Sequence, residues 1–157
     1  MNYNKVVKTS EKGILLIKNF EGLRLEAYQC SGSVWSIGWG TTMINGNKVK
    51  SGDVIDLELA EKLFRRDIEK KEDIVNSALQ ISINQNQFDA LVSHTYNTGG
   101  SETLFELINS DAGKKRIYHW FVNTYITSKG NLIQGLVKRR KIEADLFFTP
   151  TINTICI

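Results

Sequence analysis

The sequence predicts an α+β fold, in which a small N-terminal lobe with a β-hairpin is joined by a long helix to a larger helical lobe, with a cleft between them. Turn residues and short extended segments cluster at about residues 21–56. Helical patterns fill about residues 57–150, which together with the N-terminal helix make the larger lobe. With 157 residues, 41% hydrophobic and 24% charged, the chain can form one core, so we expect a single domain over residues 1–157.

The first helix is predicted to carry a carboxyl group on its apolar face. Thr9 or Ser10 can cap this helix, and Ile14, Ile17 and Glu21 then fall along one stripe. Burial disfavours the charged form of a carboxyl group and raises its pKa, which keeps a proton available near neutral pH. Glu21 is therefore a candidate general acid, although a lone Glu at a helix end is more commonly a solvated terminus.

A β-hairpin is expected directly after this helix. Residues 31–33, Ser-Gly-Ser, suit a three-residue loop. With that loop Cys30 pairs with Val34 and Tyr28 with Ser36, and the two-residue period of a strand places all four on one face. Cys30 and Ser36 would then face the same space. A lone Cys in a strand is more commonly a packed hydrophobe, and Ser36 alone carries almost no signal.

The spacing of Glu21, Cys30 and Ser36 allows a carboxyl, a thiol and a hydroxyl group to gather in one small cluster. Such a cluster suits glycoside hydrolysis, in which one group protonates the leaving sugar oxygen and others handle water. Trp35 and Trp39 alternate onto the opposite face from Ser36, so core packing is favoured for them over contact with a sugar ring.

Turn and cap signals define the remaining elements. Residues 45–47 mark a turn in the β region. Asp56 or a neighbour starts the long helix, whose middle, residues 65–67 and 69–73, is polar almost all round and is expected to be wet where it bridges the lobes. Asn84 and Gln87 suit the cap of the next helix. That helix should end at residues 98–100, and later helices are expected at residues 104–109, 114–125 and 136–148, with Pro150 ending the last.

Composition and charge narrow the function classes. A net charge of +3 and a pI of about 8.8 favour approach to an anionic cell wall, although ordinary solubility charge explains them equally well. The basic run at residues 138–141 points in different directions on a helix, so no nucleic-acid patch is predicted. No apolar stretch near the N-terminus has the length of a signal peptide or a membrane span.

No metal or cofactor is implied. His94 and His119 lie 25 residues apart without a nearby carboxylate pair, so packing or surface roles are favoured over metal ligation. Cys30 and Cys156 could form one disulfide, but this bridge would consume the thiol of the proposed cluster. We therefore expect both cysteines to be free.

Three segments, EGLRLEAY with SIGWGTT at residues 21–42, NQFDALV with YNTG at residues 86–99, and GLVKRRKIE at residues 135–143, share one resemblance. Together they resemble the phage-type lysozyme (endolysin) family of peptidoglycan glycoside hydrolases, family 24. The resemblance covers nearly the whole chain. The combination is highly specific, whereas any one segment would be only suggestive.

This resemblance implies a lysozyme-like fold and hydrolysis of the β-1,4 bond between N-acetylmuramic acid and N-acetylglucosamine in bacterial peptidoglycan. Glu21 would protonate the leaving oxygen, while Cys30 and Ser36 would hold the attacking water. The family pattern favours Arg139 as the partner of Glu21. An i,i+4 ion pair between Arg139 and Glu143 is the alternative.

Tyr96, Asn97 and Arg139 are the expected substrate-binding residues. The family commonly has Thr at the position of Ser36, whose hydroxyl is less fixed, and Asp at the position of Cys30, whose thiol is the weaker base. These departures leave open a second class of function, a catalytically weakened glycan-binding or phage assembly module.

The resemblance also sets expectations for partners and place of action. We expect peptidoglycan as the partner, a monomer, and neither nucleic-acid binding nor membrane insertion. Such an enzyme collects in the host bacterial cytoplasm and acts on the wall after release through holes made by another protein. A purely helical interaction protein would leave the hairpin after Glu21 unexplained.

Overall fold

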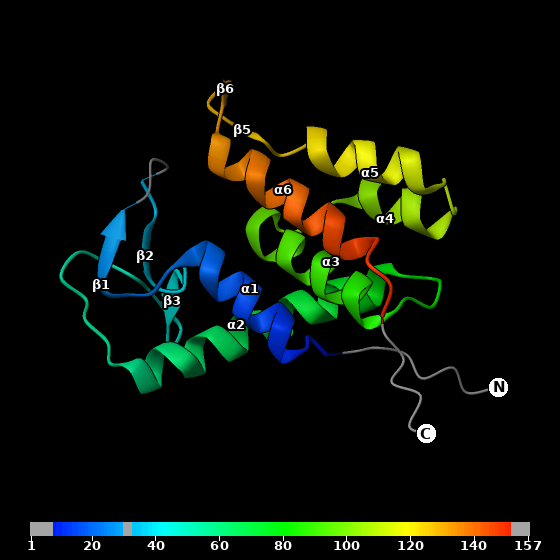
Figure 1. Ribbon diagram of the computed structural model, residues 1–157. Helices are drawn as coiled ribbons and strands as arrows, with labels where there is room; N and C mark the ends of the chain where they lie inside the picture. The colour runs from blue at the N-terminus through cyan, green and yellow to red at the C-terminus, as the bar shows by residue number, and fades with distance from the viewer. Residues whose placement is uncertain (1–7, 30–32, 152–157) are drawn as a thin grey trace.

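The computed structural model describes residues 8–29 and 33–151, and it confirms the α+β class (Figure 1). Strands β1 to β3 gather at one end of the molecule and most helices at the other, with α2 running between the two regions, while β5 and β6 lie apart at the start of α6. In the described part of the chain, no helix combines the length and the apolar character needed to cross a membrane. The helices are α1 (Glu11–Glu21), α2 (Leu57–Ala78), α3 (Gln85–Thr98), α4 (Glu102–Asn109), α5 (Lys114–Asn123) and α6 (Gln134–Phe147); the strands are β1 (Arg24–Gln29), β2 (Trp35–Gly38), β3 (Met43–Ile44), β4 (Asn47–Lys48), β5 (Thr127–Ser128) and β6 (Asn131–Leu132).

Helix α1 is fixed at both ends. Ser10 caps it by accepting a hydrogen bond from the Gly13 N–H at 3.2 Å. Gly13 must be a glycine, because a Cβ there would lie 2.7 Å from the Asp89 Cγ on α3. At the other end Gly22 stops the helix at φ 68°, a conformation that favours glycine. Glu21 is therefore the last helical residue, at the point where the chain turns into the β lobe.

The hairpin has the predicted register next to the site. Tyr28 pairs with Ser36 in the antiparallel ladder between β1 and β2, and the pairing shifts farther along, where Arg24 meets Gly38. Cys30, whose pairing with Val34 was also predicted, lies outside the described residues, as does Cys156. The predicted turn at residues 45–47 joins β3 to β4, with φ values of 48° at Asn45 and 86° at Gly46.

Helix α2 begins as predicted after the cap residue Asp56, whose side chain accepts from the Leu59 N–H at 2.8 Å. The polar residues in its middle are exposed or half-buried as expected, except Glu72, which is 3% exposed. The segment before α1 packs here, and the Thr9 N–H donates to Glu72 Oε1 at 2.7 Å. A buried carboxylate with a backbone partner looks the same in a sequence as a solvated one.

Helix α3 is the centre of the helical lobe and packs against α1, α2 and α6 (Figure 1). Its start is the predicted capping box of Asn84 and Gln87, and Gly99 ends it in a left-handed conformation at φ 86°. The helix predicted to run to residue 125 ends earlier, at Asn123. A short hairpin of β5 and β6, absent from the sequence expectations, follows and leads into α6.

Candidate active site

Glu21 is held where the two lobes meet. Its side chain is 19% exposed, and Arg139 Nη1 on α6 donates a hydrogen bond to Glu21 Oε1 at 2.7 Å. From the β lobe Gly40 approaches the other oxygen, because a Cβ at residue 40 would lie 3.4 Å from Glu21 Oε2. A larger side chain at residue 40 would begin to fill the space beside the carboxyl group.

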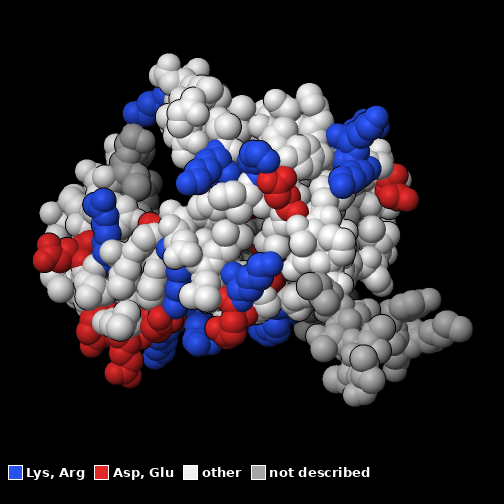
Figure 2. All heavy atoms as spheres, in the orientation of Figure 1, with Lys and Arg blue, Asp and Glu red and all other residues white. Residues whose placement is uncertain are grey.

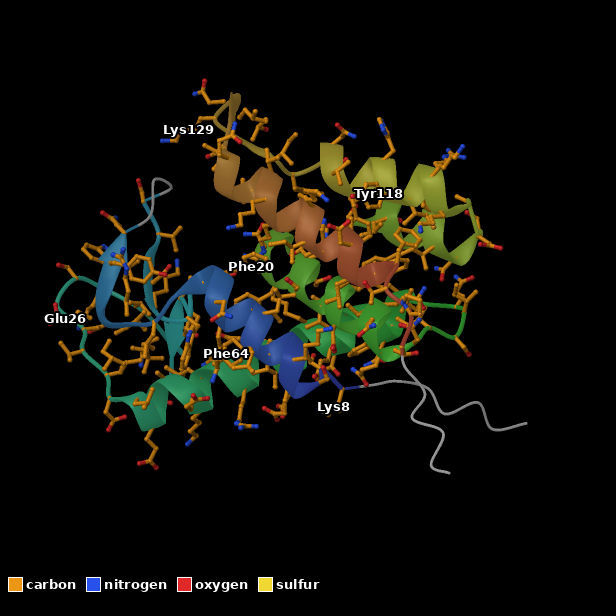
Figure 3. All side chains as sticks on the ribbon, in the orientation of Figure 1. Lys8, Phe20, Glu26, Phe64, Tyr118 and Lys129 are labelled. Carbon is orange, nitrogen blue, oxygen red and sulfur yellow. The ribbon has the colours of Figure 1, made fainter. Side chains whose placement is uncertain are left out.

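Arg139 joins Glu21 to the interior of the helical lobe. It is 4% exposed, its Nε donates to Glu143 Oε1 at 3.0 Å, and its Nη2 donates to the Ser93 carbonyl at 3.0 Å. The guanidinium group lies 4.7 Å from the centroid of Phe20, which Figure 3 labels on α1. The sequence left Glu21 and Glu143 as alternative partners, and the structure shows both contacts at once.

The turn after strand β2 lies against the carboxyl group of Glu21. Ser36 on β2 is 9% exposed. The next residue, Ile37, exchanges two backbone hydrogen bonds with Thr41, at 2.8 and 2.9 Å, so the chain doubles back tightly. Gly40, within this turn, is the residue that approaches Glu21. Ser36 thus lies in the strand that leads into the turn.

Tyr96 and Asn97 are adjacent near the end of α3. The Tyr96 hydroxyl donates to the Trp39 carbonyl at 2.7 Å, which ties α3 to the β lobe. Burial raises the pKa of Tyr96, and nearby carboxylates raise it further, so this hydroxyl keeps its proton. Asn97 is exposed, and its Oδ1 accepts a hydrogen bond from Arg140 Nη2 at 3.0 Å.

The Trp39 ring packs in the core, as the strand alternation predicted. Trp39 is 7% exposed, its ring centroid lies 5.4 Å from that of Phe64, and Lys18 Nζ lies 4.2 Å above it. Trp35 is half-buried against the same core. Of these two tryptophans and Tyr96, Tyr96 lines a cavity that also includes Gly40, the glycine that approaches Glu21; Glu21 itself is not in the lining.

This cavity has a volume of about 300 Å³ and reaches from the turn beside Glu21 to the middle of α2. Sequence reasoning missed its α2 wall, because the polar middle of that helix looked like solvated surface. Asp67 there accepts a hydrogen bond from the Thr41 hydroxyl at 2.6 Å and from Arg66 Nη2 at 2.9 Å. The lining residues are Gly40, Thr42, Met43, Arg66, Asp67, Lys70, Lys71 and Tyr96.

His94 is a packing residue, as the sequence favoured. It is 1% exposed, and its ring lies 5.5 to 5.6 Å from the ring centroids of Trp120, Phe121 and Tyr125. Burial, and then the charges of two nearby arginines, lower the pKa of His94 to about 3. Among the residues that the structure describes, no group of His, Cys, Asp and Glu could hold a metal ion.

Basic side chains do not form one stripe. On the face shown in Figure 2, Lys and Arg are spread over several elements with Asp and Glu among them. In the run at residues 138–141 the two lysines are exposed and the two arginines are buried. The run therefore divides between surface and interior, as the prediction of diverging directions required.

The two lobes, with one carboxyl group held between them, define a lysozyme-like fold. The family model for phage lysozyme matches residues 18–143. The chain is 36% identical over 144 residues to the endolysin of Acyrthosiphon pisum secondary endosymbiont phage 1, covering 88% of this chain and 96% of that protein. It is 40% identical over 146 residues to the endolysin of Bacillus phage B103, covering 89% of this chain but only 54% of that relative.

A solved structure supports the same assignment. The endolysin from Escherichia coli O157:H7 phage FAHEc1 superposes with a TM-score of 0.76 at 37% sequence identity, covering 93% of this chain and 96% of that one. The chain therefore belongs to the phage lysozyme family. It is a glycoside hydrolase with the muramidase function of an endolysin, and this family acts on bacterial peptidoglycan.

Proposed function

We propose that Glu21 is the general acid that protonates the leaving oxygen when the β-1,4 bond from N-acetylmuramic acid to N-acetylglucosamine is cleaved. One observation carries this role. Glu21 presents a carboxyl group, 19% exposed, that is held by a buried arginine at 2.7 Å and approached by Gly40 of the β lobe. A fixed carboxyl group beside free space is what proton donation to a bound sugar requires.

Cys30 and Ser36 hold the attacking water in this proposal. Support comes from the hairpin, which has the predicted pairing of Tyr28 with Ser36 and leads through a tight turn to Gly40, the residue that approaches Glu21. Water held apart from the acid attacks the far face of the sugar, so the reaction inverts the anomeric centre. Neither residue forms a bond to the sugar.

The glycan lies along the cavity of about 300 Å³ beside Glu21, with Tyr96 in its wall and Asn97 exposed next to it. The Asn97 amide group retains its N–H donors, because its Oδ1 is the atom held by Arg140. Arg139 supports binding by holding Glu21, since its guanidinium group is almost wholly enclosed.

The protein acts as a monomer, without membrane insertion. It collects in the host bacterial cytoplasm and reaches the wall after release.

Glu21→Gln tests the proposal directly. The amide keeps the shape and the hydrogen bond to Arg139 but has no proton to give, and general acid catalysis is worth about 10²- to 10⁴-fold. Turbidity loss of a cell-wall suspension should collapse by at least 100-fold, while pull-down on the same walls persists. Glu26→Gln is the control, because Glu26 is an exposed carboxylate on β1 (Figure 3). A Glu21→Gln enzyme with half of the wild-type lytic rate would refute the assignment and favour a binding module.

A further inference from the structure

The interior of the helical lobe contains an ion network that reaches two of the proposed functional side chains, Glu21 and Asn97. Glu143 on α6 is 0% exposed, and its Oε1 accepts hydrogen bonds from the Ser93 hydroxyl at 2.7 Å, from Arg139 Nε at 3.0 Å and from Arg140 Nη2 at 3.1 Å. Its Oε2 lies 2.9 Å from Arg140 Nε. One buried carboxylate therefore forms ion pairs with two neighbouring guanidinium groups.

Each arginine continues outward to the cleft. Arg139 contacts Glu21 at 2.7 Å, and Arg140, itself 0% exposed, donates to Asn97 Oδ1 at 3.0 Å. The path from the acid to the exposed amide thus runs through Glu143, with no gap longer than 3.1 Å. The three central members, Arg139, Arg140 and Glu143, are almost wholly enclosed, so solvent screens their mutual contacts little and removing one of them acts on the others.

Besides its hydrogen bonds, Glu143 contributes a negative charge that balances the buried arginines. Two arginines face Glu143 and Glu21, so the network is neutral when both carboxyl groups are charged. When Glu21 carries the proton it donates, Glu143 is the remaining counter-charge for the buried cations. Besides Arg139 and Arg140 on α6, the titratable group that acts on Glu21 from α3 is Tyr96.

We infer that Glu143 is a positioning residue of the enzyme: through Arg139 and Arg140 it orients both Glu21 and Asn97, and its charge balances that of Arg139 beside the Glu21 carboxyl group. The inference rests on the proposed role of Glu21. Without the negative charge of Glu143, Arg139 would favour the ionised form of Glu21. On the basic limb of the pH–activity profile, the pH at which activity falls would then be lower.

Glu143→Gln is the first test, with kcat and KM measured against pH on soluble, uncrosslinked peptidoglycan strands. We expect at least a tenfold lower kcat at neutral pH and a basic limb displaced to lower pH by roughly one pH unit or more, because the loss of one nearby unit charge at an effective dielectric constant near 20 has an effect of this order. The control is Asp145→Asn. Asp145 forms a 2.9 Å ion pair with Lys141 on the same helix, but both side chains are more than half exposed. This control should leave kcat and the basic limb unchanged.

Arg140→Lys tests the part of the network that runs from Glu143 through Arg140 to Asn97. It retains the charge but loses the forked contact with Glu143 and the bond to Asn97. We expect KM to rise about threefold or more with the basic limb unmoved, and Asn97→Ala added to this variant should raise KM no further. If Glu143→Gln fails to fold by circular dichroism, Ser93→Ala takes its place, since losing the 2.7 Å donor to Glu143 should displace the limb in the same direction by less.

The outcomes separate the two proposals. An active Glu21→Gln enzyme would refute the acid assignment, whatever Glu143 does. An inactive Glu21→Gln enzyme, together with a folded Glu143→Gln enzyme whose basic limb and kcat match the wild type, would overturn only the positioning role. A lower kcat without displacement of the limb would also overturn it, because a merely structural role predicts that pattern.

Discussion

The two sides of the site are built in different ways. On the helical side, Arg139, Arg140 and Glu143 are between 0% and 4% exposed, and both arginines are bonded to Glu143. On the β side, Ser36 belongs to a two-stranded hairpin whose β1 strand is largely exposed. Proton donation thus depends on a buried network, whereas water positioning depends on a thin hairpin. We therefore expect substitutions on the helical side to cost stability and those on the hairpin to cost mainly activity.

The largest effect is expected from Arg139→Met. This change leaves Glu143 with one buried partner fewer, and breaking a buried ion pair typically costs about 3–5 kcal/mol. Urea unfolding should show a loss of that size. Lys141→Met on the same helix is the control, because its exposed pair with Asp145 should contribute less than about 1 kcal/mol. Equal losses in the two variants would contradict the contrast between interior and surface.

The next effect concerns His94 and pH. Because its folded-state pKa is lowered to about 3, the unfolded chain binds the proton first as pH falls below about 6.5, and stability decreases from there towards pH 3. The loss between pH 6.5 and 5 should be about 2 kcal/mol. His94→Gln should flatten this part of the stability profile in urea unfolding. His119→Gln, at an exposed position on α5, should not.

Local signals explain which elements could be predicted from the sequence. The cap at Ser10, the capping box at Asn84 and Gln87, and the glycine that ends α3 each act within four residues, and all three are observed. The hairpin of β5 and β6 has strands of only two residues, and its turn at Lys129 and Gly130 lies in a polar run too short for any period to show.

The same distinction between local and long-range signals applies to the site. Glu21 and Ser36 stand in motifs that are contiguous in the sequence. The long-range contacts of the ion network join residues 43 to 118 positions apart, so neither the burial of Arg140 nor its bond to Asn97 has a local signal. Asp67 was misjudged for the same reason, since its partner Thr41 comes from the β lobe. One signal was available: on a helix, four consecutive basic residues cannot all face water.

On the hairpin side, Cys30→Ala should lower the lytic rate about tenfold or more by leaving the water unheld, with little change in stability. Cys30→Asp should remain active, because a carboxylate accepts a proton from water more readily than a thiol does. Lysis assays and urea unfolding on the same preparations measure both quantities. An unchanged rate in the Ala variant would remove Cys30 from the mechanism.

The smallest effect is expected at Ser36. Ser36→Thr should keep or raise activity by up to a few-fold, because the added methyl group restricts the rotation of the hydroxyl. Ser36→Ala should be clearly slower. If the Ala and Thr variants lyse walls at the same rate, the hydroxyl has a structural role only.

The central claim, that Glu21 donates the proton while the hairpin holds the attacking water, is tested most directly by the anomer that is first released. Water held by the hairpin, on the far side of the sugar from Glu21, gives the inverted α anomer. A thiolate nucleophile would instead form a covalent glycosyl-enzyme and retain the β configuration. Proton NMR of peptidoglycan digests, read before mutarotation, should show the α signal first. An initial β product, or one glycosyl unit trapped on Cys30 in the mass spectrum, would contradict the account.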